Sequence, residues 1–130
     1  LLTAQDPSRF HRLRSDEVWF YHAGAPAEMT MLCSRCAEYQ VVGQDLPQVV
    51  VPAQCWMAAR VLAEDEADWG TGRAPERRWT PDRRLTPSLH WTLVSCIVSP
   101  GFDFADFELG SREALLSEYP QARREILALT

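Results

Sequence analysis

The sequence predicts an all-β domain, either an antiparallel sandwich or a barrel. Short apolar runs, often alternating with polar residues, recur along the chain, and turn signals separate them. No helical pattern lies between these runs, which excludes an alternating arrangement of strands and helices. The predicted strands cover residues 17–21, 28–32, 39–42, 48–51, 56–62 and 89–98, and the turn signals are Gly24 with Pro26, the segment 43–47, Pro52, and Pro100 with Gly101.

The region after the last predicted strand combines a sharp corner with two short helices. Pro100 fixes φ and Gly101 can take a positive φ, so the chain turns there and brings Phe102, Phe104 and Phe107 against the strands. Asp103 and Asp106 are expected to brace the turn. Ser111 can cap a helix over 112–119, and Pro120 suits the first turn of a second helix that ends near Leu129. We expect these short C-terminal helices to cover one end or one outer face of the barrel.

Residues 63–88 form a long inserted loop, because an acidic cluster is followed by arginines among many prolines and glycines. The simpler interpretation is a solvated insertion. The functional alternative is a lid over a pocket, carrying Trp69 and Trp79.

The composition limits the classes of function. The chain of 130 residues suits a single domain, and its net charge of −5 argues against a nucleic-acid surface. No apolar run reaches the roughly 18 to 20 residues of a membrane span, and no secretory signal is visible. We therefore expect a soluble, cytoplasmic protein without a membrane partner. Because Leu1 is not an initiator methionine, we interpret the chain as processed, cut for expression or a fragment.

The four cysteines are predicted to be reduced structural thiols. Cys33 and Cys36 form the only Cys-x-x-Cys pair, and a zinc site would have to recruit Cys55 and Cys96 from elsewhere. Metal or redox function is the less favoured alternative.

The candidate chemistry lies in the segment from Phe10 to Gly24. Side chains alternate along a strand, so Glu17, Trp19 and Tyr21 share one face. If the strand before them is in phase, His11 faces the same interior as Glu17. An imidazole beside a carboxylate is a candidate pair for general acid–base catalysis.

This segment resembles the first motif of the cupin superfamily, roughly G-(x5)-H-x-H-(x3,4)-E-(x6)-G. His11, Glu17 and Gly24 match the first histidine, the glutamate and the closing glycine, while Leu13 occupies the place of the second histidine. In the second cupin motif, Met57 stands where the last histidine is expected. Only two of the four usual metal ligands therefore remain.

A closer resemblance is to a branch of small cupins of largely unknown function. The similarity covers residues 11–19 (HRLRSDEVW), 47–56 (PQVVVPAQCW) and 100–109 (PGFDFADFEL), although Gln54 replaces a glycine usual in the branch. This resemblance implies a double-stranded β-helix, or jelly roll, with a pocket inside the barrel and commonly a homodimer. It also implies that the chain lacks the N-terminal helix and strand with which members of this branch usually begin. No reaction follows from it.

The resulting prediction is a cupin that binds a small metabolite inside its barrel, with His11 and Glu17 as acid–base residues of an isomerase, epimerase, lyase or decarboxylase. The alternatives are a non-catalytic binding or sensing module and a degenerate cupin with a structural or interaction role.

We predict no resident cofactor; a divalent transition metal would have only His11 and Glu17 as ligands, which makes a metal-dependent oxygenase the least favoured function. The predicted ligand-binding residues are Trp19, Tyr21, Trp56, Met57 and Arg60, the last of which binds a carboxylate or pairs with Glu17. Trp91 is expected in the core.

Overall fold

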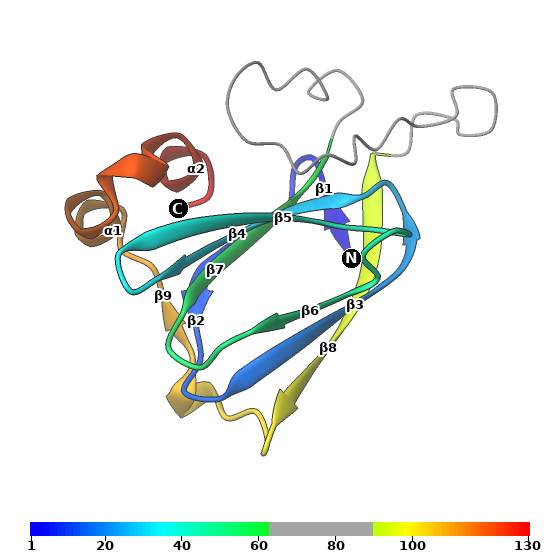
Figure 1. Cartoon of the computed structure of the whole chain (residues 1–130), viewed down its shortest axis with the longest axis horizontal. Coiled ribbons are helices and arrows are strands. Elements are labelled where there is room, and N and C mark those ends of the chain that lie inside the picture. Colours follow the sequence, from blue (N-terminus) through cyan, green and yellow to red (C-terminus); the bar gives the residue numbers. More distant parts are fainter. Residues whose placement is uncertain (63–89) are drawn as a thin grey trace.

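A computed structural model describes residues 1–62 and 90–130 of the chain. Two antiparallel sheets face each other, and two short helices lie on the outer side of one of them (Figure 1). The four-stranded sheet has the order β1 (Leu2–Thr3), β8 (Trp91–Ser99), β3 (Asp16–Gly24) and β6 (Gln48–Val51). The five-stranded sheet has the order β5 (Cys36–Val42), β4 (Ala27–Cys33), β7 (Trp56–Val61), β2 (Ser8–Arg12) and β9 (Glu108–Leu109).

The first hydrophobic core fills the space between the two sheets. Alternate residues of each strand point into it, as the period of two along a strand requires. All three methionines of the chain are fully or almost fully buried there, beside Trp19 of the opposite sheet. The larger members of this core are Leu2, Trp19, Met29, Met31, Val42, Val49, Val51, Met57 and Val61.

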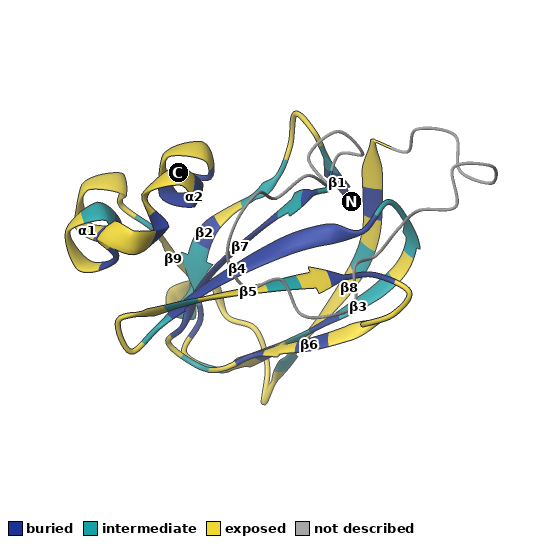
Figure 2. Ribbon diagram, turned by 45° about the horizontal axis from the view of Figure 1, so that its top comes forward, coloured by how far each residue is buried: buried dark blue, intermediate teal, exposed yellow. Residues whose placement is uncertain are grey.

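A second core separates the five-stranded sheet from α1 (Arg112–Glu118), the 3-10 turn η3 (Pro120–Ala122) and α2 (Arg123–Ala128). Phe10, Leu32 and Trp56 contribute the sheet side, and Leu115 and Ile126 contribute the helix side. As a consequence β4 is buried on both faces (Figure 2). The helices were predicted at these positions, and Ser111 is the N-cap residue, although its side chain makes no capping hydrogen bond.

The predicted strands are confirmed with small shifts at their ends, and β6 matches its prediction residue for residue. Three strands were not among those predicted: β2, of which only residues 11–13 had been considered, and the two-residue strands β1 and β9, which are too short to show an alternating pattern. The long loop predicted for residues 63–88, with Trp69 and Trp79, lies outside the described residues. None of the described helices is long and apolar enough to cross a membrane.

The prediction that Trp91 is a core residue is wrong. Its side chain is 36% exposed, and it lies over Gly24, where an added Cβ would clash with the Trp91 backbone and ring. Gly24 has φ +102°, which other residues rarely adopt. Trp91 therefore covers a glycine at the rim of the barrel instead of filling its interior.

The corner after β8 turns differently from the prediction. Gly101 does not have a positive φ; a cis peptide bond joins Ser99 to Pro100 at the turn. The 3-10 turn η2 (Phe104–Asp106) follows, and Asp103 braces it as expected, because its carboxylate accepts a hydrogen bond of 2.9 Å from the Ala105 amide.

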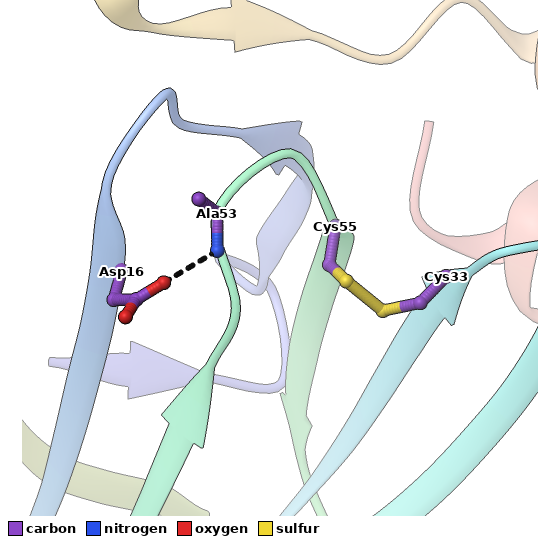
Figure 3. Close-up of a disulfide and its surroundings, with 4 residues drawn as sticks. All are labelled: Asp16, Cys33, Ala53 and Cys55. Atoms are coloured by element: carbon purple, nitrogen blue, oxygen red, sulfur yellow. Dashed lines mark hydrogen bonds between the residues drawn. A yellow bond between two sulfur atoms is a disulfide. The ribbon is translucent and has the colours of Figure 1, made fainter.

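The prediction of four reduced cysteines is also wrong, because Cys33 and Cys55 form a disulfide (Figure 3). Leu32 and Trp56 are partners in the β4–β7 register, so the next residues, Cys33 and Cys55, face each other with their Cα atoms 4.9 Å apart. The pairing depends on two strands that are distant in sequence, which spacing along the chain does not reveal. Cys36 and Cys96 are free.

Candidate functional site

The candidate site lies where β2 of one sheet approaches β3 of the other. The short connection between these strands brings His11 and Glu17 together, with His11 Nε2 3.7 Å from Glu17 Oε2. Their side chains are only 12% and 10% exposed, so the pair is largely withdrawn from water. The two residues predicted to act together are thus adjacent.

The hydrogen bond on the other side of the His11 ring determines how the pair interacts. His11 Nδ1 lies 2.8 Å from the carbonyl oxygen of Arg9, which can only accept, so Nδ1 carries a proton. A neutral ring would then present the lone pair of Nε2 to the Glu17 carboxylate, whereas a protonated ring presents an N–H group. Burial opposes protonation, but the Glu17 carboxylate and the Arg9 carbonyl outweigh it, and the pKa of His11 is raised.

The pKa of Glu17 changes in the opposite direction. Burial alone would raise it, but His11, the indole of Trp19 and the thiol of Cys96 together lower it below the ordinary value. Both shifts favour the form of the pair in which His11 is protonated and Glu17 is ionised.

Trp19 adds a hydrogen-bond donor to this pair. The residue is 4% exposed, and its indole Nε1 is buried without a hydrogen-bond partner of good geometry among the described residues. The N–H lies close enough to lower the pKa of Glu17, but it is not satisfied by that carboxylate. A buried donor without a partner is costly, so it points to a place that an acceptor atom of a ligand can fill.

Two further residues belong to the site that sequence analysis had not assigned to it. Phe107 stacks on the His11 ring with a centroid distance of 5.2 Å, because β9 pairs with β2 directly after Phe107. Cys96 is the β8 partner of Trp19, and desolvation and the neighbouring Glu17 carboxylate raise its pKa to about 12. Phe107 was one of the three phenylalanines predicted to pack against the strands after the Pro100–Gly101 corner. Its contact with His11 depends on the pairing of β2 with β9, which are far apart in the sequence.

The other predicted binding residues divide between the two faces of the barrel wall. Met57 faces the interior and is the register partner of His11, and half-buried Tyr21 packs against the same core while its hydroxyl donates to the Gly24 carbonyl at 2.6 Å. Trp56 belongs to the second core, beneath the helices, where Arg12 lies over its ring at 4.4 Å. Trp56 and Met57 are neighbours on one strand, so they do not line one pocket as predicted.

Arg60 does not pair with Glu17, which was one of the two roles predicted for it. Its Nε donates to Glu28 Oε2 at 2.8 Å, on the outer face of β7 and β4. Arg60 is therefore separated from the His11–Glu17 pair by the sheet itself.

The residues present do not fit the resident metal ion that the cupin fold often carries. By the motif resemblance, Leu13 and Met57 stand in two of the ligand positions, and their side chains offer no nitrogen or oxygen. Among residues 1–62 and 90–130, no group of three or more His, Cys, Asp or Glu side chains is placed to hold a metal ion. One imidazole and one carboxylate make a weak site for a first-row transition metal.

A hollow of about 210 Å³ is lined by Phe107 and by four charged residues, Arg12, Arg14, Asp106 and Glu108. Its charged residues are already paired: Arg12 bonds Glu108 at 2.7 Å and Arg14 lies 3.3 Å from Asp106. The hollow is smaller than the usual 300 to 1,000 Å³ of a small-molecule pocket. We therefore regard the His11–Glu17 pair, and not this hollow, as the candidate centre.

Comparison with known proteins gives a family and no reaction. A hypothetical protein from Leishmania major has a similar structure, with a TM-score of 0.74 and 30% identity over 99% of this chain and 72% of its own. A protein of known crystal structure from Shewanella oneidensis gives a TM-score of 0.69 and 33% identity over 99% of this chain and 70% of its own. No curated protein matches the chain significantly.

The family model described as Cupin superfamily (DUF985) matches residues 1–110, which include both sheets, the His11–Glu17 pair and the Phe-rich corner. The chain therefore belongs to this family of the cupin superfamily.

Proposed function

We propose that this cupin binds a small metabolite beside His11 and Glu17 and transfers a proton on it, as an isomerase, epimerase, lyase or decarboxylase does. The observation that carries the proposal is the buried His11–Glu17 pair beside a Trp19 N–H that has no hydrogen-bond partner of good geometry among the described residues. A structural ion pair would not require an additional unsatisfied donor. The proposal therefore rests on three groups that converge on one point.

The roles follow from the protonation states. The Trp19 N–H and the protonated His11 Nε2 both donate, so they suit a carbonyl or carboxylate oxygen of the substrate. Glu17 is ionised and accepts a proton from the adjacent carbon or hydroxyl group, and His11 donates one to the oxygen on which negative charge develops. The raised pKa of His11 keeps the ring protonated but weakens it as an acid, and the lowered pKa of Glu17 keeps the carboxylate ionised but weakens it as a base. Phe107 and the Arg9 carbonyl hold the His11 ring in one orientation.

A screen for hydrogen exchange tests this proposal on many candidate substrates at once. The protein is incubated in D₂O with pools of small oxo- and hydroxycarboxylic acids, and deuterium incorporation at carbon is followed by NMR and mass spectrometry. We expect one or more compounds to exchange, and His11→Ala and Glu17→Gln to reduce the rate at least a hundredfold. His22→Ala is the matched control, because His22 bonds Ser95 on the outer face and is remote from Glu17. Full exchange by His11→Ala would overturn the mechanism.

The same screen distinguishes the alternatives. A compound that raises the melting temperature but is recovered without deuterium would indicate a binding or sensing module. Binding and exchange both absent across the pools would favour a structural or interaction role.

We also propose a homodimer that uses the outer face of the four-stranded sheet. Part of this face is apolar: Val50, Val18 and Ile97 form one row across three strands, and Ile97 is 57% exposed. Exposed apolar rows of this kind are typical of protein interfaces. Ile97→Glu should convert the dimer to a monomer in analytical ultracentrifugation, whereas Leu127→Glu, on an exposed helix position, should not. A wild-type chain that is monomeric at 100 μM would contradict this proposal.

A further inference from the structure

Three of the four cysteines form a row across three neighbouring strands. β5, β4 and β7 are adjacent in the five-stranded sheet, and Cys33 at the end of β4 has Cys36 of β5 as its register partner on one side. On its other side lies Cys55, directly before β7, to which it is bonded (Figure 3). Residues directly opposite each other on antiparallel strands point to the same face, so all three sulfur atoms belong to one face.

Cys36 is placed to compete with Cys55 for Cys33. The two residues between Cys33 and Cys36, Ser34 and Arg35, have φ values of 48° and 65°, as in the tight turn of a two-residue hairpin. Residues that flank such a turn have Cβ atoms about 4.5 to 5.5 Å apart, and a disulfide needs about 3.5 to 4.5 Å. A small movement is therefore sufficient to join Cys33 to Cys36. Cys36 is free and exposed, whereas Cys55 is buried.

We propose that Cys36, Cys33 and Cys55 form a thiol–disulfide exchange site in which Cys33 changes partner. The thiolate of Cys36 attacks Cys33 Sγ and forms the new bond. The bond between Cys33 and Cys55 breaks, its electron pair goes to Cys55 Sγ, and the proton that Cys36 released returns to Cys55 through solvent. One disulfide and one thiol are present before and after, so the step needs no oxidant or reductant.

The exchange changes how the turn at residues 52–55 is held. With Cys55 bonded to Cys33, this turn is tethered to the end of β4. The same turn bonds the connection between β2 and β3: the Gln54 amide donates to the Leu13 carbonyl at 2.8 Å, and the Ala53 amide donates to Asp16 Oδ1 at 2.7 Å (Figure 3). After exchange the disulfide closes the β4–β5 hairpin, and hydrogen bonds alone hold the turn.

Peptide mapping of the wild-type chain tests the proposal. The protein is incubated with excess N-ethylmaleimide, which traps whichever thiol is free, and is then digested without reduction and analysed by mass spectrometry. We expect label on both Cys36 and Cys55, together with peptides linked through Cys33–Cys36 and through Cys33–Cys55. Labelling of Cys55 should become faster as the pH rises, because the thiolate is the attacking species. Its rate should not depend on protein concentration, since the step is intramolecular.

Two variants make the test decisive. Cys36→Ser should abolish labelling of Cys55, and Cys55→Ser should form the Cys33–Cys36 bond in a buffer of reduced and oxidised glutathione. If Cys55→Ser fails to fold, Cys36→Ser still tests the proposal, because the label that wild type carries on Cys55 must be absent from this variant. Equal labelling of Cys55 with and without Cys36, or wild-type protein that contains only the Cys33–Cys55 bond at every pH, would overturn the proposal.

Discussion

Two buried pairs of opposite charge, one on each face of the five-stranded sheet, differ in what they can do. Glu28 and Arg60 are register partners on the outer face, with Nε and Oε2 2.8 Å apart, and their side chains are 9% and 22% exposed. His11 and Glu17 lie toward the inner face, are similarly buried, and are 3.7 Å apart. Burial alone therefore does not distinguish the two pairs.

The difference lies in the cation and its surroundings. A guanidinium keeps its proton at every accessible pH, so the pair of Arg60 and Glu28 can hold strands together but cannot transfer a proton. An imidazole titrates near neutrality, and the pair that contains it is accompanied by a buried indole N–H for which the described residues offer no partner. The candidate site is therefore identified by the titratable imidazole of His11 and the indole N–H of Trp19, and not by buried charge alone.

The largest expected effect is a loss of stability when the Glu28–Arg60 pair is broken. Arg60→Met leaves Glu28 buried without its cation, so it should lower the free energy of unfolding by about 3 kcal/mol, as the loss of one partner of a buried pair does. The double variant Glu28→Leu with Arg60→Met should recover most of this loss. Urea unfolding followed by fluorescence measures both. A smaller loss for Arg60→Met than for His11→Ala would contradict the assignment of Arg60 to structure.

Trp19→Phe should separate stability from binding at the inner pair. The substitution removes the buried N–H while it keeps an aromatic ring, and the smaller ring in the core should lower the free energy of unfolding by about 1 to 2 kcal/mol. The affinity for any compound found in the exchange screen should fall about tenfold, because one hydrogen bond to the ligand is lost. Trp91→Phe is the matched control at the barrel rim. Unchanged affinity in Trp19→Phe would show that the indole N–H does not contact the ligand.

The dependence of stability on pH should distinguish the pairs further. The pKa of His11 is raised above 6.5, so its contribution is complete below that pH and is lost as the pH rises through the folded-state value. The pKa of Glu17 is lowered below 4.5, so its contribution is present above that pH and is lost as the pH falls through the folded-state value. Both contributions are present between about pH 4.5 and 6.5.

His11→Gln should therefore lower stability most in this window, by on the order of 1 kcal/mol, and less above it. The effect of Arg60→Met should not decline toward pH 8, because a guanidinium does not titrate there. Urea unfolding of wild type and both variants at pH 5.5, 7 and 8 checks this. If the free energy of unfolding of His11→Gln differed from that of wild type by the same amount at all three pH values, the interaction of His11 with Glu17 would not contribute to stability.

The contrast between the pairs also shows what sequence can and cannot predict. The strands, the terminal helices and the meeting of His11 with Glu17 follow from local alternation and a family motif. The partner of Arg60, the disulfide of Cys33 and the contact of Phe107 with His11 depend on which strands are neighbours and in which register, and a single sequence contains no direct signal for either. Trp91 was misplaced because apolar runs do not reveal which strand ends are at the rim.

The smallest expected effect concerns the backbone beside the site, where the two pairs also differ. Glu28 and Arg60 lie in regular strands, whereas the turn next to His11 contains Gln54 at φ +66°, a conformation that costs a non-glycine residue about 1 kcal/mol. The backbone amide of Gln54 donates to the Leu13 carbonyl at 2.8 Å, whereas its side-chain amide lies 3.4 Å from the same oxygen. Gln54→Gly should relieve this strain and, after the added flexibility of the unfolded chain is subtracted, raise stability by up to about 0.5 kcal/mol. Thermal unfolding of the variant beside Gln54→Ala, which keeps the strain and should be no more stable than wild type, measures the difference. A destabilised Gln54→Gly would show that the glutamine side chain supports the turn more than its backbone strains it.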